Sequence, residues 1–268
     1  MTPRRIDLNC DLGESFGAYA LGAAVEILPL VTSVNIACGF HAGDPAVMRR
    51  TARAAIEKGV AIGAHPGLPD LQGFGRRAMD VTSQEVSDMV LYQIGALFAL
   101  VKAEGGTLSH VKPHGALYNM AAADARLADA IADAVRRFDP ALVLFGLAGS
   151  ESLRAGERVG LRVAAEAFAD RTYQPNGTLT PRHHPKALLT DPLQAAAQAA
   201  RIVIEGKAGT VESEDIAIRA DTICIHGDGP HALAFAQAIK RRLEAEGVAM
   251  MPCISLSSLS PGRDRGQG

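Results

Sequence analysis

The sequence alternates short apolar runs with longer segments of helical periodicity along most of its 268 residues. We expect strands where the apolar runs have strand length, at Arg5–Asn9, Val34–Cys38, Val60–Ala64, Leu108–Lys112, Leu142–Leu147, Leu161–Glu166 and Thr222–His226. Strands that alternate with helices pair in parallel, through right-handed crossovers. Seven such units predict an α/β fold that closes into a (β/α) barrel of seven strands, and a doubly wound open sheet is the alternative.

The segments between these runs carry residues that start and stop helices. We expect helices at Asp44–Lys58, Ser83–Glu104, Ala123–Phe138, Glu151–Gly156, Asp191–Glu205 and Pro230–Gly247. Asp44 and Asp191 each precede a proline, which places a capping carboxylate before a proline at the first helical position. Thr82 is followed three residues later by Glu85, which predicts a capping box. Gly59 stands where the first of these helices should end.

Composition and charge exclude several classes of protein. Hydrophobic residues make up 48% of the chain, which suffices for a large core, and 27 basic against 29 acidic residues leave a formal net charge of −2. A nucleic-acid-binding protein normally shows a basic face, so we expect no nucleic-acid partner. We find no apolar run long enough to span a bilayer and no apolar signal region, and we therefore expect a cytoplasmic protein without a membrane partner.

The four cysteines, Cys10, Cys38, Cys224 and Cys253, are far apart and form no C-x-x-C pair. We expect them to be reduced and to pack as small apolar side chains. Neither a low-complexity linker nor an internal repeat divides the sequence. We therefore predict one barrel domain over residues 1–254, followed by a flexible, polar, glycine-rich tail over residues 255–268.

Polar side chains gather where the predicted strands end. From the first strand to the seventh they are Asp7, Asn9, Asp11, Glu14, Asn35, His41, His65, Lys112, His114, Glu166, Asp170, Arg171, His226 and Asp228. The carboxyl ends of parallel barrel strands lie on one face, where barrel enzymes hold their active sites. The opposite ends carry mostly glycine, alanine and helix caps. This asymmetry predicts an enzyme.

Several of these residues also admit structural roles. Asp7 and Asn9 alternate with apolar neighbours and therefore point into the barrel, where an acid is costly unless it is bonded. Glu14 could cap the turn after the first strand, and His41 could be a solvated loop residue ahead of a helix. His65 could be a core histidine whose hydrogen bonds are satisfied. The sequence leaves these alternatives open.

The polar strand ends suit two kinds of chemistry. An acid and two histidines from separate strand ends could bind a divalent metal, but no H-x-H or H-E-x-x-H pair fixes two ligands at once, so we assign no metal ligands. Without a metal, the same groups suit acid–base catalysis on an amide, with Lys112 stabilising developing negative charge. Neither a G-x-x-x-x-G-K-[ST] loop nor a G-x-G-x-x-G turn is present, so we do not expect this chain alone to bind a nucleotide.

Seven stretches carry a family resemblance. They are DLNCDLGESFG (Asp7–Gly17), VNIACGFHAGD (Val34–Asp44), GAHPG (Gly63–Gly67), GFGRR (Gly73–Arg77), HVKPHGALYN (His110–Asn119), FADRTYQPNGTLTPR (Phe168–Arg182) and TICIHGD (Thr222–Asp228). Together, and in this order, they resemble the LamB/YcsF family of 5-oxoprolinase A subunits. The resemblance runs from Ile6 to about Met250, and the length and order of the motifs make it specific.

The resemblance implies a barrel related to polysaccharide deacetylases and glycoside hydrolases. It also implies ATP-dependent opening of 5-oxoproline (pyroglutamate) to L-glutamate, with two partner subunits, B and C, and with ATP and Mg²⁺ bound at the level of the complex. For such an enzyme we predict catalytic roles for Asp7, Asp11, His41, His65, Lys112 and His114. We predict substrate-binding roles for Asn9, Glu14, Asn35, Arg171, His226 and Asp228.

Two other functions are compatible with the same residues. A stand-alone metal-dependent deacetylase or amidohydrolase would use this polar face without ATP, and metal analysis with activity after chelation would separate it from the first function. A regulatory or sugar-binding subunit without enzymatic activity is the other alternative. Binding alone rarely needs an acid, a base and a cation together, so we favour an enzyme.

Overall fold

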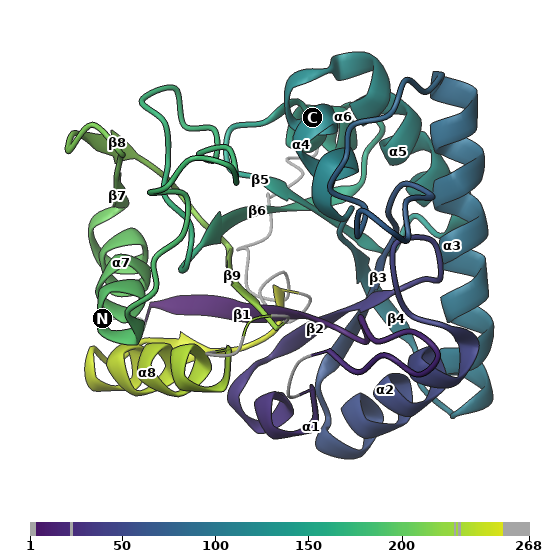
Figure 1. Ribbon diagram of the computed structural model, residues 1–268, viewed down its shortest axis with the longest axis horizontal. Coiled ribbons are helices and arrows are strands. Elements are labelled where there is room, and N and C mark those ends of the chain that lie inside the picture. The colour runs from purple at the N-terminus through teal and green to yellow at the C-terminus, as the bar shows by residue number, and fades with distance from the viewer. Residues whose placement is uncertain (1–3, 22–23, 228, 230–231, 254–268) are drawn as a thin grey trace, which may run out of the picture.

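Seven parallel strands close into a barrel in the computed structural model, which describes residues 4–21, 24–227, 229 and 232–253 (Figure 1). In order around the barrel they are β1 (Arg5–Leu12), β2 (Ser33–Ala37), β3 (Ala61–His65), β4 (Leu108–Val111), β5 (Val143–Leu147), β6 (Arg162–Phe168) and β9 (Thr222–His226). β1 pairs with β9 from Asp7 opposite Thr222 to Asp11 opposite His226, and this pairing closes the sheet. The seven-stranded barrel is therefore confirmed, and the alternative of an open sheet is wrong.

Helices cover the outside of the barrel (Figure 1). They are α1 (Ala24–Ile27), α2 (Pro45–Lys58), α3 (Ser83–Ala103), α4 (Gly115–Ala123), α5 (Ala125–Phe138), α6 (Glu151–Arg158), α7 (Pro192–Glu205) and α8 (Ala232–Ala245). The predicted helix termini are confirmed: Asp44 caps α2, Thr82 and Glu85 form the capping box of α3, and Gly59 ends α2 at a φ of 67°.

Some elements did not follow from the sequence. Helix α4 begins directly after His114, where we expected no helix. Two short strands, β7 (Lys207–Gly209) and β8 (Asp215–Ala217), form a separate antiparallel ribbon, and β10 (Ala249–Met250) pairs with the first residues of β1. Strands of two or three residues carry too few side chains to show a periodic pattern.

Helix α3 corrects one expectation from the sequence. By length and composition it could cross a membrane, although we had found no apolar run that long. In the structure it packs against α5, α2 and the barrel. The apolar residues of one face are fully buried; they are Val86, Val90, Ile94, Leu97 and Val101. Their spacing is that of a helix that packs on a protein core, which accounts for the apolar composition.

All four cysteines are buried and free, as expected for reduced thiols. Their side chains are therefore part of the packing of the barrel and do not cross-link it. The tail predicted at residues 255–268 lies outside the described residues.

The interior of the barrel is polar, and its lowest layer is built around Asp7. This carboxylate accepts hydrogen bonds from the hydroxyl groups of Thr32 at 2.5 Å, Ser33 at 2.7 Å and Thr222 at 2.6 Å. Asp7 is fully buried, so these bonds replace the water that it loses on folding. The aliphatic core lies instead between the strands and the helices.

A second polar layer lies above the first. Asn9 donates to Glu166 at 2.9 Å and to Thr222 at 2.7 Å, and its carbonyl oxygen accepts from Asn35 at 2.7 Å. The Nε2 atom of His110 lies 2.8 Å from the carbonyl oxygen of Asn35. Each side chain in this layer thus bonds to a side chain from another strand, which links β1, β2, β4, β6 and β9 across the barrel.

Gly63 of β3 leaves the space that the ring of His110 occupies. A Cβ atom at position 63 would overlap this ring. The ring cannot move aside freely, because it stacks on Phe145 with 4.2 Å between ring centroids and is held at Nδ1 by Ser109 at 2.8 Å. The absence of a side chain at Gly63 is therefore a condition for the second polar layer.

We predict that Gly63→Ala lowers the free energy of unfolding by about 2–3 kcal/mol, because the added methyl group overpacks a rigid interior. Urea unfolding followed by circular dichroism measures the effect. Gly209→Ala in β7 is the control, since an added Cβ there meets nothing within 4 Å, and it should change stability by less than about 1 kcal/mol. Equal stabilities of the two variants would contradict the steric argument.

Candidate active site

A pocket opens at the carboxyl ends of the barrel strands. Its volume is about 40 Å³, and it adjoins a larger hollow of about 410 Å³ with which it shares lining residues. The pocket is lined by Asp11, His65, Arg76, Lys112, Pro113, His114, Gly115, Tyr118, Asn119, Phe168, Arg171, Leu179, Arg182 and His226. The structure thus brings half of the twelve predicted site residues into one pocket.

Lys112 is the charged centre of the pocket floor. Its side chain is 2% exposed, and its Nζ lies 2.9 Å from Asp11 Oδ1 and 2.9 Å from Glu166 Oε1. The same ammonium group lies 3.3 Å from Asn9 Oδ1 and 3.0 Å from Cys224 Sγ. Burial alone lowers the pKa of a lysine, but the neighbouring carboxylates outweigh burial and raise the pKa of Lys112 above 10.5.

Asp11 joins Lys112 to His65. Its Oδ1 accepts from Lys112 and, at 2.8 Å, from the side-chain amide of Asn35, while its Oδ2 lies 3.4 Å from His65 Nε2. Burial raises the pKa of Asp11, but His65 and Lys112 outweigh burial and hold this pKa well below 3.8. Asp11 is therefore ionised at neutral pH and is a weak proton acceptor.

His65 and His114 each use one ring nitrogen to bond a backbone carbonyl. His65 Nδ1 lies 2.7 Å from the carbonyl oxygen of Lys112, and His114 Nε2 lies 2.8 Å from that of Phe74. A carbonyl oxygen only accepts, so the proton of each ring sits on that nitrogen. The other two nitrogens, His65 Nε2 and His114 Nδ1, face each other at 2.9 Å.

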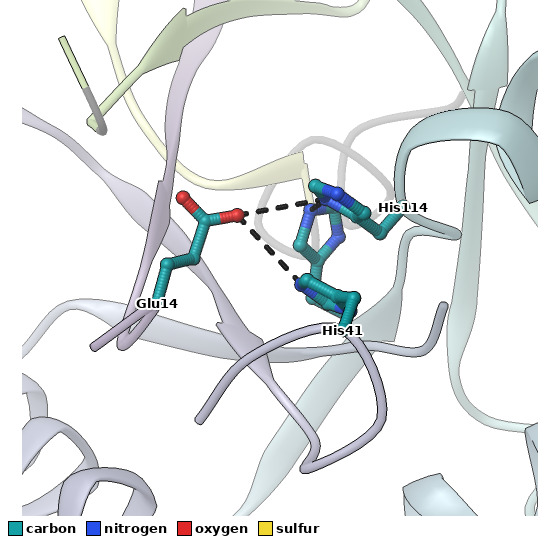
Figure 2. A group of neighbouring side chains, drawn as sticks. Glu14, His41 and His114 are labelled. Carbon is teal, nitrogen blue, oxygen red and sulfur yellow. Dashed lines mark hydrogen bonds and ion pairs between the residues drawn. The ribbon is translucent and has the colours of Figure 1, made fainter. Parts of the chain in front are cut away.

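Glu14 and His41 complete this cluster (Figure 2). His41 Nε2 lies 3.7 Å, and His114 Nδ1 3.5 Å, from the same oxygen of Glu14. The rings of His41 and His114 stack with centroids 3.7 Å apart. Burial, reinforced by neighbouring histidines, lowers the pKa of both His41 and His114 well below 6.5, so both rings are neutral at neutral pH.

Among the residues that the structure describes, two groups of side chains could hold a metal ion. The first is Glu14, His41, His65 and His114, and the second is Asp11, Cys224 and His226. In the second group Lys112 already contacts both Asp11 and Cys224. The first group therefore fits a metal better. It was not visible as a sequence pattern, because its members come from four separate segments.

His226 forms a dyad with Asp170 on another wall of the pocket. Its Nδ1 lies 2.8 Å and 3.0 Å from the two carboxylate oxygens of Asp170, and its Nε2 lies 3.0 Å from a guanidinium nitrogen of Arg182. An arginine only donates, so Nε2 is an acceptor and Nδ1 carries the proton. His226 is thus held in the tautomer that can accept a proton at Nε2.

Three arginines surround the pocket mouth. Arg76, Arg171 and Arg182 line both the pocket and the adjoining hollow. Burial, together with the charge of Arg182, lowers the pKa of Arg171 to about 10. Arg171 also donates to the carbonyl oxygen of Thr180 at 2.6 Å, which fixes it in the wall. The mouth of the pocket therefore attracts an anion.

Three further predicted site residues lie beneath the pocket. Asn9 and Asn35 form the layer beneath Lys112, and Asp7 lies one layer deeper. Asp228 lies outside the described residues. The sequence pattern does not predict how deep in the barrel each of these residues lies, because alternate residues of a strand point into the barrel along its whole length.

Sequence reasoning missed two arginines of the mouth. Arg76 lies in the motif GFGRR, and Arg182 is the last residue of the motif FADRTYQPNGTLTPR, but we predicted no role for either. Both lie in loops well beyond the end of a strand, where position along the chain does not reveal proximity. The sequence pattern that could have indicated a functional role for them is the occurrence of arginines next to glycine and proline in these loop motifs.

Comparison with known proteins identifies the family of the chain. The profile of the LamB/YcsF family matches residues 6–258. The chain belongs to the LamB/YcsF family. The resemblance noted in the sequence is confirmed by this match, which covers most of the chain.

Relatives from bacteria match most of the chain. A relative from Bacillus licheniformis, named as the A subunit of 5-oxoprolinase, is 62% identical over 244 residues, which cover 91% of this chain and 96% of that one. The protein of the same name from Bacillus subtilis is 60% identical over 244 residues, covering 91% and 95%.

Two solved structures share the barrel fold of this chain. The Lactam Utilization Protein from Thermus thermophilus superposes with a TM-score of 0.87 at 51% identity and covers 92% of this chain and 99% of that one. A protein from Enterococcus faecalis V583 superposes with a TM-score of 0.55 at 16% identity, over 95% of this chain and 99% of that one, and shares the fold alone.

The buried position of Asp7 leads to a prediction about stability. Burial raises the pKa of Asp7 above 3.8 despite its three hydroxyl partners. At a pH between 3.8 and the pKa of Asp7 in the folded protein, this carboxyl is protonated in the folded state and ionised in the unfolded state. The contribution of Asp7 to the free energy of unfolding therefore decreases as the pH rises. We therefore expect Asp7→Asn to be most destabilising near pH 4 and less so at higher pH.

Urea unfolding from pH 4 to pH 8 tests this expectation. Gly209→Ala, which removes no titrating group, should differ from the wild type by a constant amount over the same range. A constant difference for Asp7→Asn as well would show that the pKa of Asp7 is not raised in the folded protein.

Proposed function

We propose that this chain is the A subunit of a 5-oxoprolinase, which opens 5-oxoproline to L-glutamate at the expense of ATP. The proposal is supported by relatives of that name that are 60–62% identical and match over 95–96% of their length. We also propose that ATP and Mg²⁺ bind to partner subunits B and C, since the chain contains no phosphate-binding loop motif. Such a complex would be cytoplasmic.

The observation that carries the proposal is the pairing of arginines at the mouth with a lysine–carboxylate cluster on the floor. 5-Oxoproline is a small lactam with one carboxylate. Arg171 and Arg182 would bind that carboxylate, or a phosphoryl group on an activated substrate, by charge-assisted hydrogen bonds. The lactam would then lie against Lys112 and Asp11 on the floor.

The need for ATP follows from the chemistry of the ring. A five-membered lactam is stabilised by resonance, and its carbonyl carbon is a poor electrophile. Phosphorylation of the lactam oxygen makes this carbon electrophilic, so that water adds to it and the C–N bond breaks, leaving an acyl phosphate of glutamate. A second water then hydrolyses this acyl phosphate to L-glutamate and phosphate. We propose that the partners carry out the phosphorylation and that the present chain hydrolyses the activated ring.

Individual roles follow from the geometry. Lys112, held by Asp11 and Glu166, would stabilise negative charge that develops on the reacting carbon's oxygens. Because the pKa of Asp11 is low, its assignment as the general base is weak. His226, oriented by Asp170, is the better acceptor for the proton of the attacking water, and it could return this proton to the ring nitrogen as the bond breaks.

A stand-alone amidohydrolase that needs no ATP is the second candidate. The cluster of Glu14 with three histidines favours it, because a metal ion can activate water without any partner. The deciding experiment measures glutamate release from 5-oxoproline by this chain alone and with subunits B and C, with and without ATP. Release that requires both partners and ATP supports the 5-oxoprolinase, and no release with all components present would refute it.

The two candidate bases can be distinguished by kinetics of the full complex. We expect His226→Gln to lower kcat by about 10²–10⁴-fold, the usual contribution of a general base. If Asp11 were the base, the wild-type rate would not fall until the pH dropped below 3.8, because the pKa of Asp11 lies lower still. A kcat of His226→Gln that stays within about 10-fold of the wild-type value would contradict the assignment of the base to His226.

Removing one arginine of the mouth should weaken substrate binding. We expect Arg182→Gln to raise KM for 5-oxoproline by about 10–100-fold, since a hydrogen bond to a charged group contributes about 1.5–3 kcal/mol. Steady-state kinetics of the complex measure this. Arg162→Gln is the matched control, because Arg162 is exposed at the start of β6, at the other end of the barrel. Equal KM values for the two variants would remove Arg182 from the substrate site.

A further inference from the structure

The facing nitrogens of His65 and His114 identify a binding site that the proposed function does not require. We propose that a divalent transition-metal ion such as Zn²⁺ binds between Glu14, His41, His65 and His114. The site would supply one carboxylate oxygen and three imidazole nitrogens, which is a ligand set suited to such ions. The proposal stands independently of whether the chain acts on 5-oxoproline.

The hydrogen bonds of the two rings carry the first argument. His65 Nδ1 donates to the carbonyl oxygen of Lys112, and His114 Nε2 donates to that of Phe74. In neutral rings, the nitrogens that face each other at 2.9 Å therefore both present lone pairs. Two lone pairs at this distance repel each other unless a positive charge lies between or beside them. A metal ion provides that charge.

The distances among the ligand atoms give the second argument. Zinc bonded at about 2.0–2.1 Å in a tetrahedron places its ligand atoms about 3.3 Å apart. The separations here are 2.9 Å between His65 Nε2 and His114 Nδ1, 3.5 Å between His114 Nδ1 and Glu14 Oε1, and 3.7 Å between His41 Nε2 and Glu14 Oε1. The cluster thus has the size of a metal site.

His41 gives an independent third argument. It is fully buried, yet neither of its ring nitrogens has a hydrogen-bond partner among the residues that the structure describes. An unpaired buried polar group is costly, so a partner is expected. A Cβ atom at Gly67 would lie 2.5 Å from His41 Nδ1, which shows that this edge of the ring lies against the backbone. Nε2 is therefore the nitrogen that faces Glu14, as Figure 2 shows.

The surroundings of the cluster match those of a bound ion. The two backbone carbonyls that accept from His65 and His114 fix the orientation of these rings, as supporting groups do around metal ligands. The rings of His41 and His114 stack in parallel, and both present a ring nitrogen to the same oxygen of Glu14. His65 and His114 also line the pocket, so the ion can reach the site from solvent.

Two competing explanations can be tested. A second proton shared by His65 and His114 would also remove the repulsion between their nitrogens. Alternatively, a metal could bind at Asp11, Cys224 and His226. In that group the ammonium of Lys112 contacts Asp11 and Cys224, and the nitrogens of His226 bond Asp170 and Arg182.

The test uses the full chain, stripped of metal by chelation and titrated with Zn²⁺ by calorimetry and with Co²⁺ by visible absorption. We expect one ion per chain and a Co²⁺ spectrum of a four-coordinate nitrogen–oxygen site. Glu14→Gln and His114→Asn should each weaken binding by at least about 100-fold, more than the loss of a supporting group. His226→Gln is the matched control and should bind as tightly as the wild type.

Three outcomes would overturn the proposal. They are the absence of stoichiometric binding, binding that is unchanged in Glu14→Gln, and binding that is lost in His226→Gln but kept in Glu14→Gln. Glu14→Gln preserves shape, and circular dichroism establishes that each variant is folded. Metal binding is read without any substrate, so failure of the site and failure of the proposed function are distinguishable.

Discussion

The buried ion pair of Lys112 with Asp11 and Glu166 is the interaction on which the rest of the barrel interior depends. A charged lysine that is 2% exposed is tolerable only if carboxylates and hydrogen bonds replace its water, and both carboxylates lie 2.9 Å from it. Those carboxylates need partners in turn. Asn35 donates to Asp11 and Asn9 donates to Glu166, so the polar layer under Lys112 holds the charges above it.

This polar interior reverses the usual arrangement of a barrel. The centre of a seven-stranded barrel would ordinarily be filled by branched aliphatic side chains. Here hydrogen-bonded side chains occupy much of it, beside the ring of Phe145, and the main apolar core lies between strands and helices. A buried polar group is costly without a partner, and the glycine at position 63 leaves the space in which the ring of His110 bonds Asn35.

The sequence predicted the architecture well and the site only in part. Alternating strands and helices predict the barrel, and helix caps such as Asp44 and Thr82 define where helices begin. Polar strand ends predict the face that holds the pocket. The alternation of polar and apolar residues along a strand shows which residues face the interior of the barrel but not how far they lie from the pocket. Asp7 was therefore predicted as catalytic although it lies two layers beneath Lys112. Contacts between a loop and a strand end, such as Arg182 with His226, depend on how distant segments pack.

Asp11 connects the two halves of the site. Its Oδ1 bonds Lys112 and its Oδ2 lies 3.4 Å from His65, so a single carboxylate divides its oxygens between the lysine and the histidine cluster. His65 in turn bonds the backbone carbonyl of Lys112, which closes a ring of contacts. A change in charge between His65 and His114 must therefore alter the field at Lys112 through one rigid carboxylate. The histidine cluster and the pocket floor consequently form one electrostatic unit.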